Sequence, residues 1–169
     1  MAFKTWTVGE VLTAADLNRY AMQQAFVVKP SDETVSSTTM QDDDHLLIAA
    51  AANTNYWLDA YVIYSGGDIR IHFTGPPSST LQWNAMALNT SSTSSNPFDT
   101  IHIKSYGYAT DLASGGWGSS HDMGLSIRGV LRGGPSAGTL LLRWALPSGE
   151  SQAVTVRAGS TIRLTKLPS

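Results

Sequence analysis

The sequence predicts an all-β fold, a jelly-roll-like antiparallel β-sandwich preceded by an N-terminal extended arm and one short α-helix. Three observations predict it. Beyond residue 29, eight to nine short apolar segments follow one another at spacings of roughly 10–15 residues. Several of these segments alternate apolar and polar side chains, which is the period of a half-buried strand. Turn residues separate the segments without any intervening helical pattern, so we expect strand to follow strand directly.

The length and composition fit one such domain. The chain has 169 residues and 42% of them are hydrophobic, which is enough for a buried core. Only 14% are charged and the formal net charge is −2, so the surface is solvated mainly by hydroxyls and amides. No basic stripe is visible, and we expect no nucleic-acid partner. We divide the chain into an arm and helix at residues 1–29 and a jelly-roll β domain at residues 30–169.

The sequence lacks the features that mark membrane-spanning, secreted and disulfide-bonded proteins. No stretch approaches the ~20 uncharged apolar residues of a membrane helix, so we expect no membrane insertion. The N-terminal residues include Lys4 and Glu10 and hold no continuous apolar run, unlike a secretory signal. The chain has 0 cysteines, which excludes disulfides and thiolate metal sites.

The N-terminal segment is predicted to dock on another surface. Its first part is extended and interrupted by Gly9, and its apolar residues have no periodic partner within the segment. Thr13 is placed to cap a helix over residues 14–25, and Pro30 prevents its continuation. An isolated helix of about twelve residues is marginal in water, so it must pack on its own domain or on a partner subunit. The residues expected to anchor the chain are Phe3, Trp6, Val8, Val11, Leu12, Leu17 and Tyr20.

The clearest strand is predicted at residues 56–64 (YWLDAYVIY), which are rich in aromatic and β-branched side chains. Both of its faces are largely apolar. One face carries Leu58, Ala60, Val62 and Tyr64, and the other carries Trp57, Tyr61 and Ile63. Since both faces need burial, we expect the second face to lie at a subunit interface.

The remaining strands are placed around this one. Residues 31–45 are polar and acidic, and the strand that follows them at residues 46–48 is short. Residues 69–73 alternate cleanly between apolar and polar side chains, as a half-buried antiparallel strand does. Further strands are expected at residues 81–88, 101–108, 125–131, 139–145, 154–156 and 162–164.

Two polar loops join these strands, at residues 89–99 and 114–121. Such loops gather at the ends of a sandwich, where contact with other molecules is made. Trp117 lies among glycines in the second loop, where few neighbours can bury it. It is therefore predicted to be exposed and to contact a ligand such as a carbohydrate. Trp144, within an apolar strand, is expected in the core.

No arrangement of residues predicts catalysis, a metal site or a cofactor. Residues 119–122 (SSHD) are adjacent in the sequence, whereas a catalytic triad assembles in space. Residues 42–45 (DDDH) lack the spacing of a calcium loop, so we expect a solvated acidic turn, with weak capture of a cation at a subunit interface as the alternative. His72 and His102 are expected on the solvent-facing sides of their strands. No pair of aspartates is selected for glycosidase chemistry.

Four segments resemble small structural proteins of tailed phages that infect actinobacteria. They are residues 9–18 (GEVLTAADLN), 56–73 (YWLDAYVIYSGGDIRIHF), 137–146 (AGTLLLRWAL) and 158–167 (AGSTIRLTKL). In those proteins an extended arm and a helix precede a β domain similar to the trimeric jelly rolls of phage decoration and receptor-binding proteins.

The resemblance implies an accessory virion protein that assembles as a homotrimer and attaches to other phage virion proteins through its N-terminal arm. It implies a minor tail or fibre module that touches the host, with Trp117 as the candidate contact for a host cell-surface glycan. A capsid decoration protein that stabilises the head is the alternative, and a carbohydrate-active tail enzyme is the less favoured one. Such a protein is made in the host cytoplasm and released in the virion by lysis. No catalytic residue carries over from the family.

Overall fold

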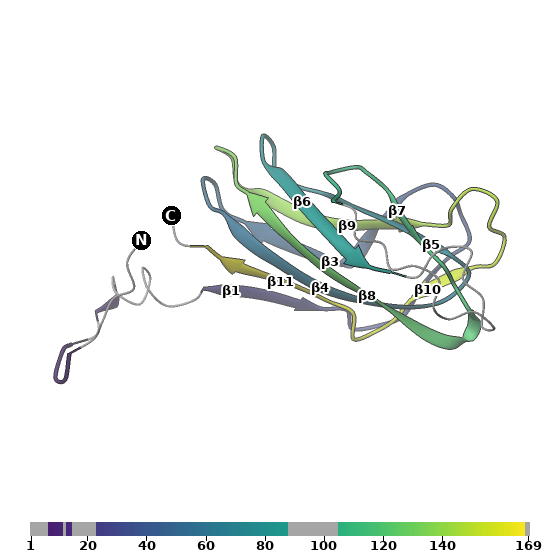
Figure 1. The fold of residues 1–169 in the computed structure, drawn as a ribbon, viewed down its shortest axis with the longest axis horizontal. Coiled ribbons are helices and arrows are strands. Elements are labelled where there is room, and N and C mark those ends of the chain that lie inside the picture. Colours follow the sequence, from purple (N-terminus) through teal and green to yellow (C-terminus); the bar gives the residue numbers. More distant parts are fainter. Residues whose placement is uncertain (1–6, 12, 15–22, 88–104, 168–169) are drawn as a thin grey trace.

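The computed structural model describes residues 7–11, 13–14, 23–87 and 105–167, which form eleven β-strands in two sheets (Figure 1). In chain order the strands are β1 (Gln24–Val28), β2 (Glu33–Val35), β3 (Gln41–Ala50), β4 (Tyr56–Gly66), β5 (Ile69–Thr74), β6 (Thr80–Met86), β7 (Leu112–Ser114), β8 (Gly118–Arg132), β9 (Gly138–Ala145), β10 (Val154–Val156) and β11 (Thr161–Lys166).

The larger sheet is built around β4, which pairs with β8 along most of its length. On its other side β4 pairs first with β11 and, further along, with β10. The sheet continues outward from β11 to β1, from β10 to β2, and from β8 to β6. All of these pairs are antiparallel, so the order across the sheet is β1/β2, β11/β10, β4, β8, β6.

The smaller sheet has the order β3, β9, β5, β7, again with antiparallel pairs. From β3 to β10, each strand lies in the opposite sheet from the strand before it, and the first and last strands, β1 and β11, lie side by side. Two packed antiparallel sheets connected in this way make a jelly roll. The structure confirms the predicted jelly-roll-like β-sandwich, with β6 added at one edge of the larger sheet.

The core lies between the sheets and is filled by the inward face of each. The buried side chains of β4 are those that the alternation predicted, Leu58, Ala60, Val62 and Tyr64. The inward face of β5 carries Ile69, Ile71 and Phe73. Phe73 meets Trp83 of β6 edge to face, with ring centroids 5.2 Å apart, so the aromatic contact joins the two sheets.

The β domain begins earlier than predicted. Gln24 and Ala25, expected at the end of a helix, are the first residues of β1 and pair with β11. Residues 26–28 (FVV) then supply the aromatic and β-branched side chains of a strand. Residues 24–28 therefore belong to the β domain and not to the arm, and the predicted helix does not extend to residue 25. Residues 15–22 of that helix lie outside the described residues.

The acidic stretch before residue 46 also contains strands that the sequence did not predict. β2 lies within it, paired with β10, and β3 begins at Gln41. The pairing of β3 with β9 shifts register between Asp42 and Leu47, which marks a bulge. Residues 42–45 are therefore part of a strand and are not a solvated turn.

The second glycine-rich loop is shorter than predicted. β7 ends at Ser114 and β8 begins at Gly118, so only residues 115–117 separate them. The start of β8 finds its backbone partner on β4, where Gly118 stands opposite Gly66. The loop predicted at residues 89–99 lies outside the described residues, as do residues 101–104 of the strand predicted at 101–108. Residues 105–108 are described and form only an isolated bridge, between Tyr106 and Trp83.

The burial of Trp144 predicts how much stability its removal costs. Its side chain is fully buried on β9, and we expect Trp144→Ala to lower the free energy of unfolding by about 3–5 kcal/mol, because the change removes apolar contact and leaves a cavity. Leu47 is 40% exposed on β3 and serves as the control, for which Leu47→Ala should cost less than half as much. Denaturant unfolding of both variants measures this, and equal losses would contradict the assignment of the core.

Candidate functional site

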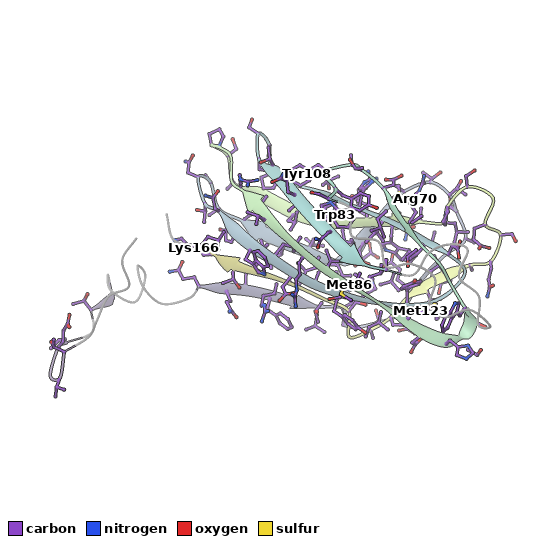
Figure 2. The ribbon with its side chains drawn as sticks, viewed as in Figure 1. Arg70, Trp83, Met86, Tyr108, Met123 and Lys166 are labelled. Carbon is purple, nitrogen blue, oxygen red and sulfur yellow. The ribbon has the colours of Figure 1, made fainter. Side chains whose placement is uncertain are left out.

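The outward face of the larger sheet carries large apolar side chains that the domain leaves uncovered. Their exposed fractions are Phe26 58%, Val28 48%, Trp57 41%, Tyr61 48% and Met86 58%, with Met86 labelled in Figure 2. We call these five residues the outer apolar face. They come from β1, β4 and β6, which span the sheet from one edge to the other.

The strand register brings these residues into rows. Val28 stands opposite Thr161, which stands opposite Tyr61. Tyr61 stands opposite Ser126, and Ser126 opposite Met86. Side chains at paired positions point to the same face of a sheet, so Val28, Tyr61 and Met86 lie on one line across it. The predicted interface residues Trp57, Tyr61 and Ile63 all lie on this outward face, although Ile63 is partly buried.

A charged group divides this face. The next row places Arg163, Asp59 and Arg128 side by side on β11, β4 and β8. Asp59 forms an ion pair with Arg163 and a longer one, 3.9 Å, with Arg128. One carboxylate between two guanidinium groups leaves a net positive charge at the centre of a largely apolar surface.

Two shallow hollows lie beside β4 on this face. One, of about 250 Å³, is lined by residues that include Phe26, Asp59 and Tyr61. The other, of about 340 Å³, is lined by Trp57, Gln82, Asn84 and Arg128 among others. The absence of a side chain at Gly124 leaves room for the tyrosine, because a Cβ added there would lie 2.2 Å from the Tyr61 hydroxyl oxygen. The surface therefore combines apolar rings with amide and guanidinium groups.

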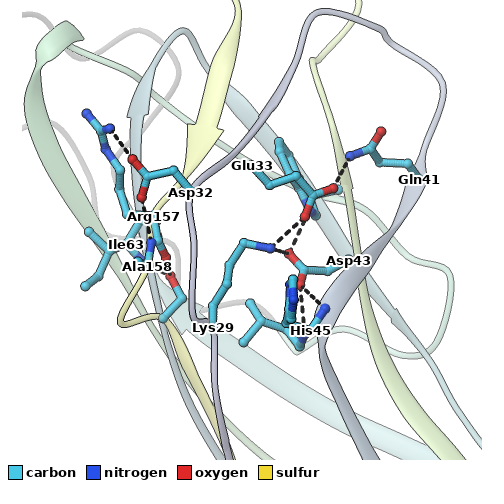
Figure 3. Close-up of polar contacts among 12 residues, drawn as sticks. Lys29, Asp32, Glu33, Gln41, Asp43, His45, Ile63, Arg157 and Ala158 are labelled. Carbon is cyan, nitrogen blue, oxygen red and sulfur yellow. Dashed lines mark hydrogen bonds and ion pairs between the residues drawn. The ribbon is translucent and has the colours of Figure 1, made fainter.

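A buried polar cluster joins the two sheets on the inside (Figure 3). Lys29 follows β1, and its side chain is fully buried with Nζ 2.8 Å from Oδ2 of Asp43 and 2.6 Å from Oε2 of Glu33. Asp43, equally buried on β3, also accepts a hydrogen bond from Nε1 of Trp144 at 3.1 Å. The sequence analysis missed this cluster, because it placed Asp43 in a solvated turn and had no signal that Lys29 points inward.

The three consecutive aspartates have different surroundings. Asp42 pairs with Arg143 of β9 at 2.6 Å, Asp43 pairs with Lys29, and Asp44 is exposed. Among the residues that the structure describes, no group of three or more His, Asp or Glu side chains is arranged to hold a metal ion. Capture of a cation at a subunit interface stays untested.

The histidines and the serine–histidine segment form no catalytic triad within the described ranges. His72 faces outward on β5 but is buried, and its Nδ1 lies 2.7 Å from Oδ1 of Asp111. Ser120 contacts His121 at 3.0 Å, while the neighbouring Asp122 forms an ion pair with Arg157. His102 lies outside the described residues.

The prediction that Trp117 is exposed at a loop tip is wrong. Its side chain is partly buried and packs against the core. The segment before it is docked onto the domain, since the amide of Gly116 donates to Oδ1 of Asp68 at 2.8 Å. Burial raises the pKa of the Asp68 carboxyl. Trp117 is therefore packed against the sandwich, and its contact with a ligand stays a prediction.

The predicted anchoring residues are mostly outside the described part of the chain. Of that set, Val8 and Val11 are described and fully or largely exposed, at 109% and 79%. Phe3, Trp6, Leu12, Leu17 and Tyr20 lie outside the described residues. The anchoring role of the arm stays a prediction.

Comparison with known proteins identifies no relative. Scans of protein-family models, of curated proteins and of solved structures each found no match to this chain. Within the described ranges, no helix is long and apolar enough to cross a membrane.

The Tyr64 hydroxyl gives a pH-dependent prediction. It lies 2.8 Å from Ser114 and donates to the carbonyl of Gly115 at 2.6 Å, and burial raises its pKa to about 12 from 10.0. Between pH 10.0 and about 12 the unfolded chain loses this proton and the folded one keeps it, so stability should fall as pH rises through this window.

The measurement compares wild type with Tyr64→Phe by denaturant unfolding across that range. The variant should be less stable at neutral pH by about 1–3 kcal/mol, because Ser114 and Gly115 lose a buried partner. The wild-type stability should decline more steeply above pH 10, by at most about 1.4 kcal/mol per pH unit. If the unfolding free energies of wild type and variant instead fall in parallel above pH 10, the prediction for Tyr64 is wrong.

Proposed function

We propose that this chain is an accessory structural protein of a tailed-phage particle, a minor tail or fibre module that assembles as a homotrimer. The observation that carries the proposal is the outer apolar face, Phe26, Val28, Trp57, Tyr61 and Met86. A soluble monomer rarely leaves a broad apolar patch in water, so such a face fits a second protein surface. The phage identity itself rests on the resemblance of the sequence segments described above.

The charges on this face restrict which surfaces can cover it. Asp59 stands between Arg128 and Arg163, so a partner that covers the face must match a central positive charge as well as the apolar rows. Such matching restricts the orientations in which two copies can dock. The trimer as the oligomer rests on analogy with other jelly-roll assemblies, which is a fold-level argument.

The arm supports attachment to other virion proteins. Val8 and Val11 are at least 79% exposed, so they find little cover in the described part of their own chain. Burial of one such side chain contributes about 1.5–3 kcal/mol. Several together could hold the protein on a particle after the cost of ordering the arm.

A capsid decoration protein is the alternative, since it would use the same apolar face and the same arm. A map of the virion discriminates the two, because it places the protein on the head or on the tail. Adsorption to host cells by particles that lack the protein gives an independent answer.

A carbohydrate-active enzyme is the third possibility. Glycoside hydrolysis uses a pair of carboxylates in a cleft. Of the described residues that line the two hollows, Asp59 alone is a carboxylate, and Arg163 holds it. Reducing ends released from actinobacterial cell-wall polysaccharide by the wild type but not by Asp59→Asn would favour the enzyme over the structural protein.

The first test of the proposal is the oligomeric state. Light scattering should give the wild type the mass of three 18.1 kDa chains. Tyr61→Glu should reduce this mass to that of a monomer, because the change buries a carboxylate in the contact. Leu47→Glu is the matched control, since Leu47 is 40% exposed on the outward face of the smaller sheet. A wild-type monomer at micromolar concentration would overturn the trimer, and a trimer that survives Tyr61→Glu would overturn the outer apolar face as its contact.

The second test separates the arm from the domain. Deletion of residues 1–22 should leave a folded β domain that no longer incorporates into particles. Deletion of residues 1–29 should in addition lower the melting temperature, because it removes β1 and the buried Lys29. Thermal melts and particle incorporation measure the two effects. An unfolded product of the shorter deletion would show that the arm is part of the core.

A further inference from the structure

The side chains of Lys29 and Asp43 are held in contact, as an amine and a carboxyl group would be before they react with each other. A primary amine and a carboxyl group lie 2.8 Å apart, both fully buried, and a second carboxyl group, that of Glu33, lies 2.6 Å from the same nitrogen (Figure 3). Reactive groups held in contact inside a protein gain the large advantage of an intramolecular reaction. Bulk water, which would favour hydrolysis, is kept from both side chains.

We propose that the chain forms an amide bond within itself, between Nζ of Lys29 and Cγ of Asp43, with Glu33 as the catalytic acid and base. This reaction joins β3 of the smaller sheet to the segment between β1 and β2 of the larger one. It goes beyond the proposed virion function and does not depend on it.

The aspartate is held as the electrophile of such a reaction. Its Oδ1 accepts hydrogen bonds from the backbone amides of His45 at 2.9 Å and Leu46 at 2.7 Å. Two amides aimed at one oxygen stabilise the negative charge that develops there when an amine adds to the carboxyl carbon. The other oxygen, Oδ2, faces Nζ and the Trp144 indole. Oδ1 therefore stays as the amide carbonyl, and Oδ2 leaves.

The protons balance with the groups present. One proton passes from the Lys29 ammonium to Oδ2 of Asp43, which gives a neutral amine and a neutral acid. The nitrogen lone pair then forms the bond to Cγ. Glu33 takes a second proton from the nitrogen and returns it to the Oδ2 hydroxyl, the Cγ–Oδ2 bond breaks, and one water leaves. The third proton stays on the amide nitrogen, Glu33 is regenerated, and no oxidant or other reactant is needed.

Glu33 is positioned for this task. The side-chain amide of Gln41 donates to its Oε1 at 2.8 Å, which leaves Oε2 directed at Nζ. Its carboxyl group is 21% exposed, so the released water has a path to solvent. Before reaction the cluster holds one buried cation and two carboxylates, and bond formation removes one opposite pair of charges from the low-dielectric interior. The site therefore favours the amide product.

Chemical cleavage gives a direct test on the full chain. Cyanogen bromide cuts after methionine, and Met40 lies between Lys29 and Asp43. Cleavage after Met22, Met40 and Met86 releases residues 23–40 and residues 41–86 as separate fragments if no cross-link exists. We expect one joined species in denaturant, with a mass equal to the sum of the two fragments less one water. Two free fragments of full mass overturn the proposal.

Variants then assign the roles. Lys29→Leu and Asp43→Ala, which add no methionine, should each give free fragments, whether or not the variant folds. Glu33→Gln keeps the shape but cannot relay the proton, and should slow cross-linking by about 100-fold or more. Asp44→Asn, which changes the exposed neighbour, should cross-link like the wild type. Unchanged cross-linking in Glu33→Gln would overturn the catalytic role of Glu33.

Discussion

The arrangement of the two sheets depends most on the contact between Lys29 and Asp43. An ammonium group taken from water into the core costs several kcal/mol unless it is well paired. Here Lys29 comes from the larger sheet, and Asp43 comes from the smaller one and is itself held by Trp144. A shift between the sheets would break this contact and leave a charge buried without its partner, in addition to disturbing the apolar packing.

The strands around Lys29 accommodate it. The outermost strand of the larger sheet is interrupted between β1 and β2, and its neighbour is interrupted at the same level between β10 and β11. Two backbone hydrogen bonds join the interruptions, from Lys29 to the carbonyl of Ser160 at 2.8 Å and from Gly159 to that of Lys29 at 2.9 Å. The backbone is therefore satisfied where the lysine leaves the regular ladder, and the side chain is free to turn inward.

Period-two alternation predicted β4, β5 and the core faces, because a sheet with one face on the core must turn every second side chain inward. The alternation does not hold in β3, where a bulge changes which side chains point inward. In β3 both Asp43 and Leu46 are buried, although they are three positions apart. The partner that explains this, Lys29, lies 14 residues earlier, so no local pattern reveals it. The alternation within β4 predicts that Trp57 and Tyr61 share the outward face. The row that Tyr61 forms with Val28 and Met86 depends on a register that only the folded sheet defines.

The buried cluster also lies where mechanical load would enter the domain. A particle that pulls on the arm pulls first on β1, an edge strand whose described ladder partner is β11 alone. Because β1 lies at the edge of the sheet, it would be the first element to detach under such a pull. Lys29 is the residue directly after β1, and its contact with Asp43 reaches across the core to β3. A covalent bond at that point would stop the detachment at the end of β1 and pass the load to the opposite sheet. If the arm attaches the chain to a particle, as we propose, an internal cross-link at this point would keep the domain folded while the chain is held at its N-terminus.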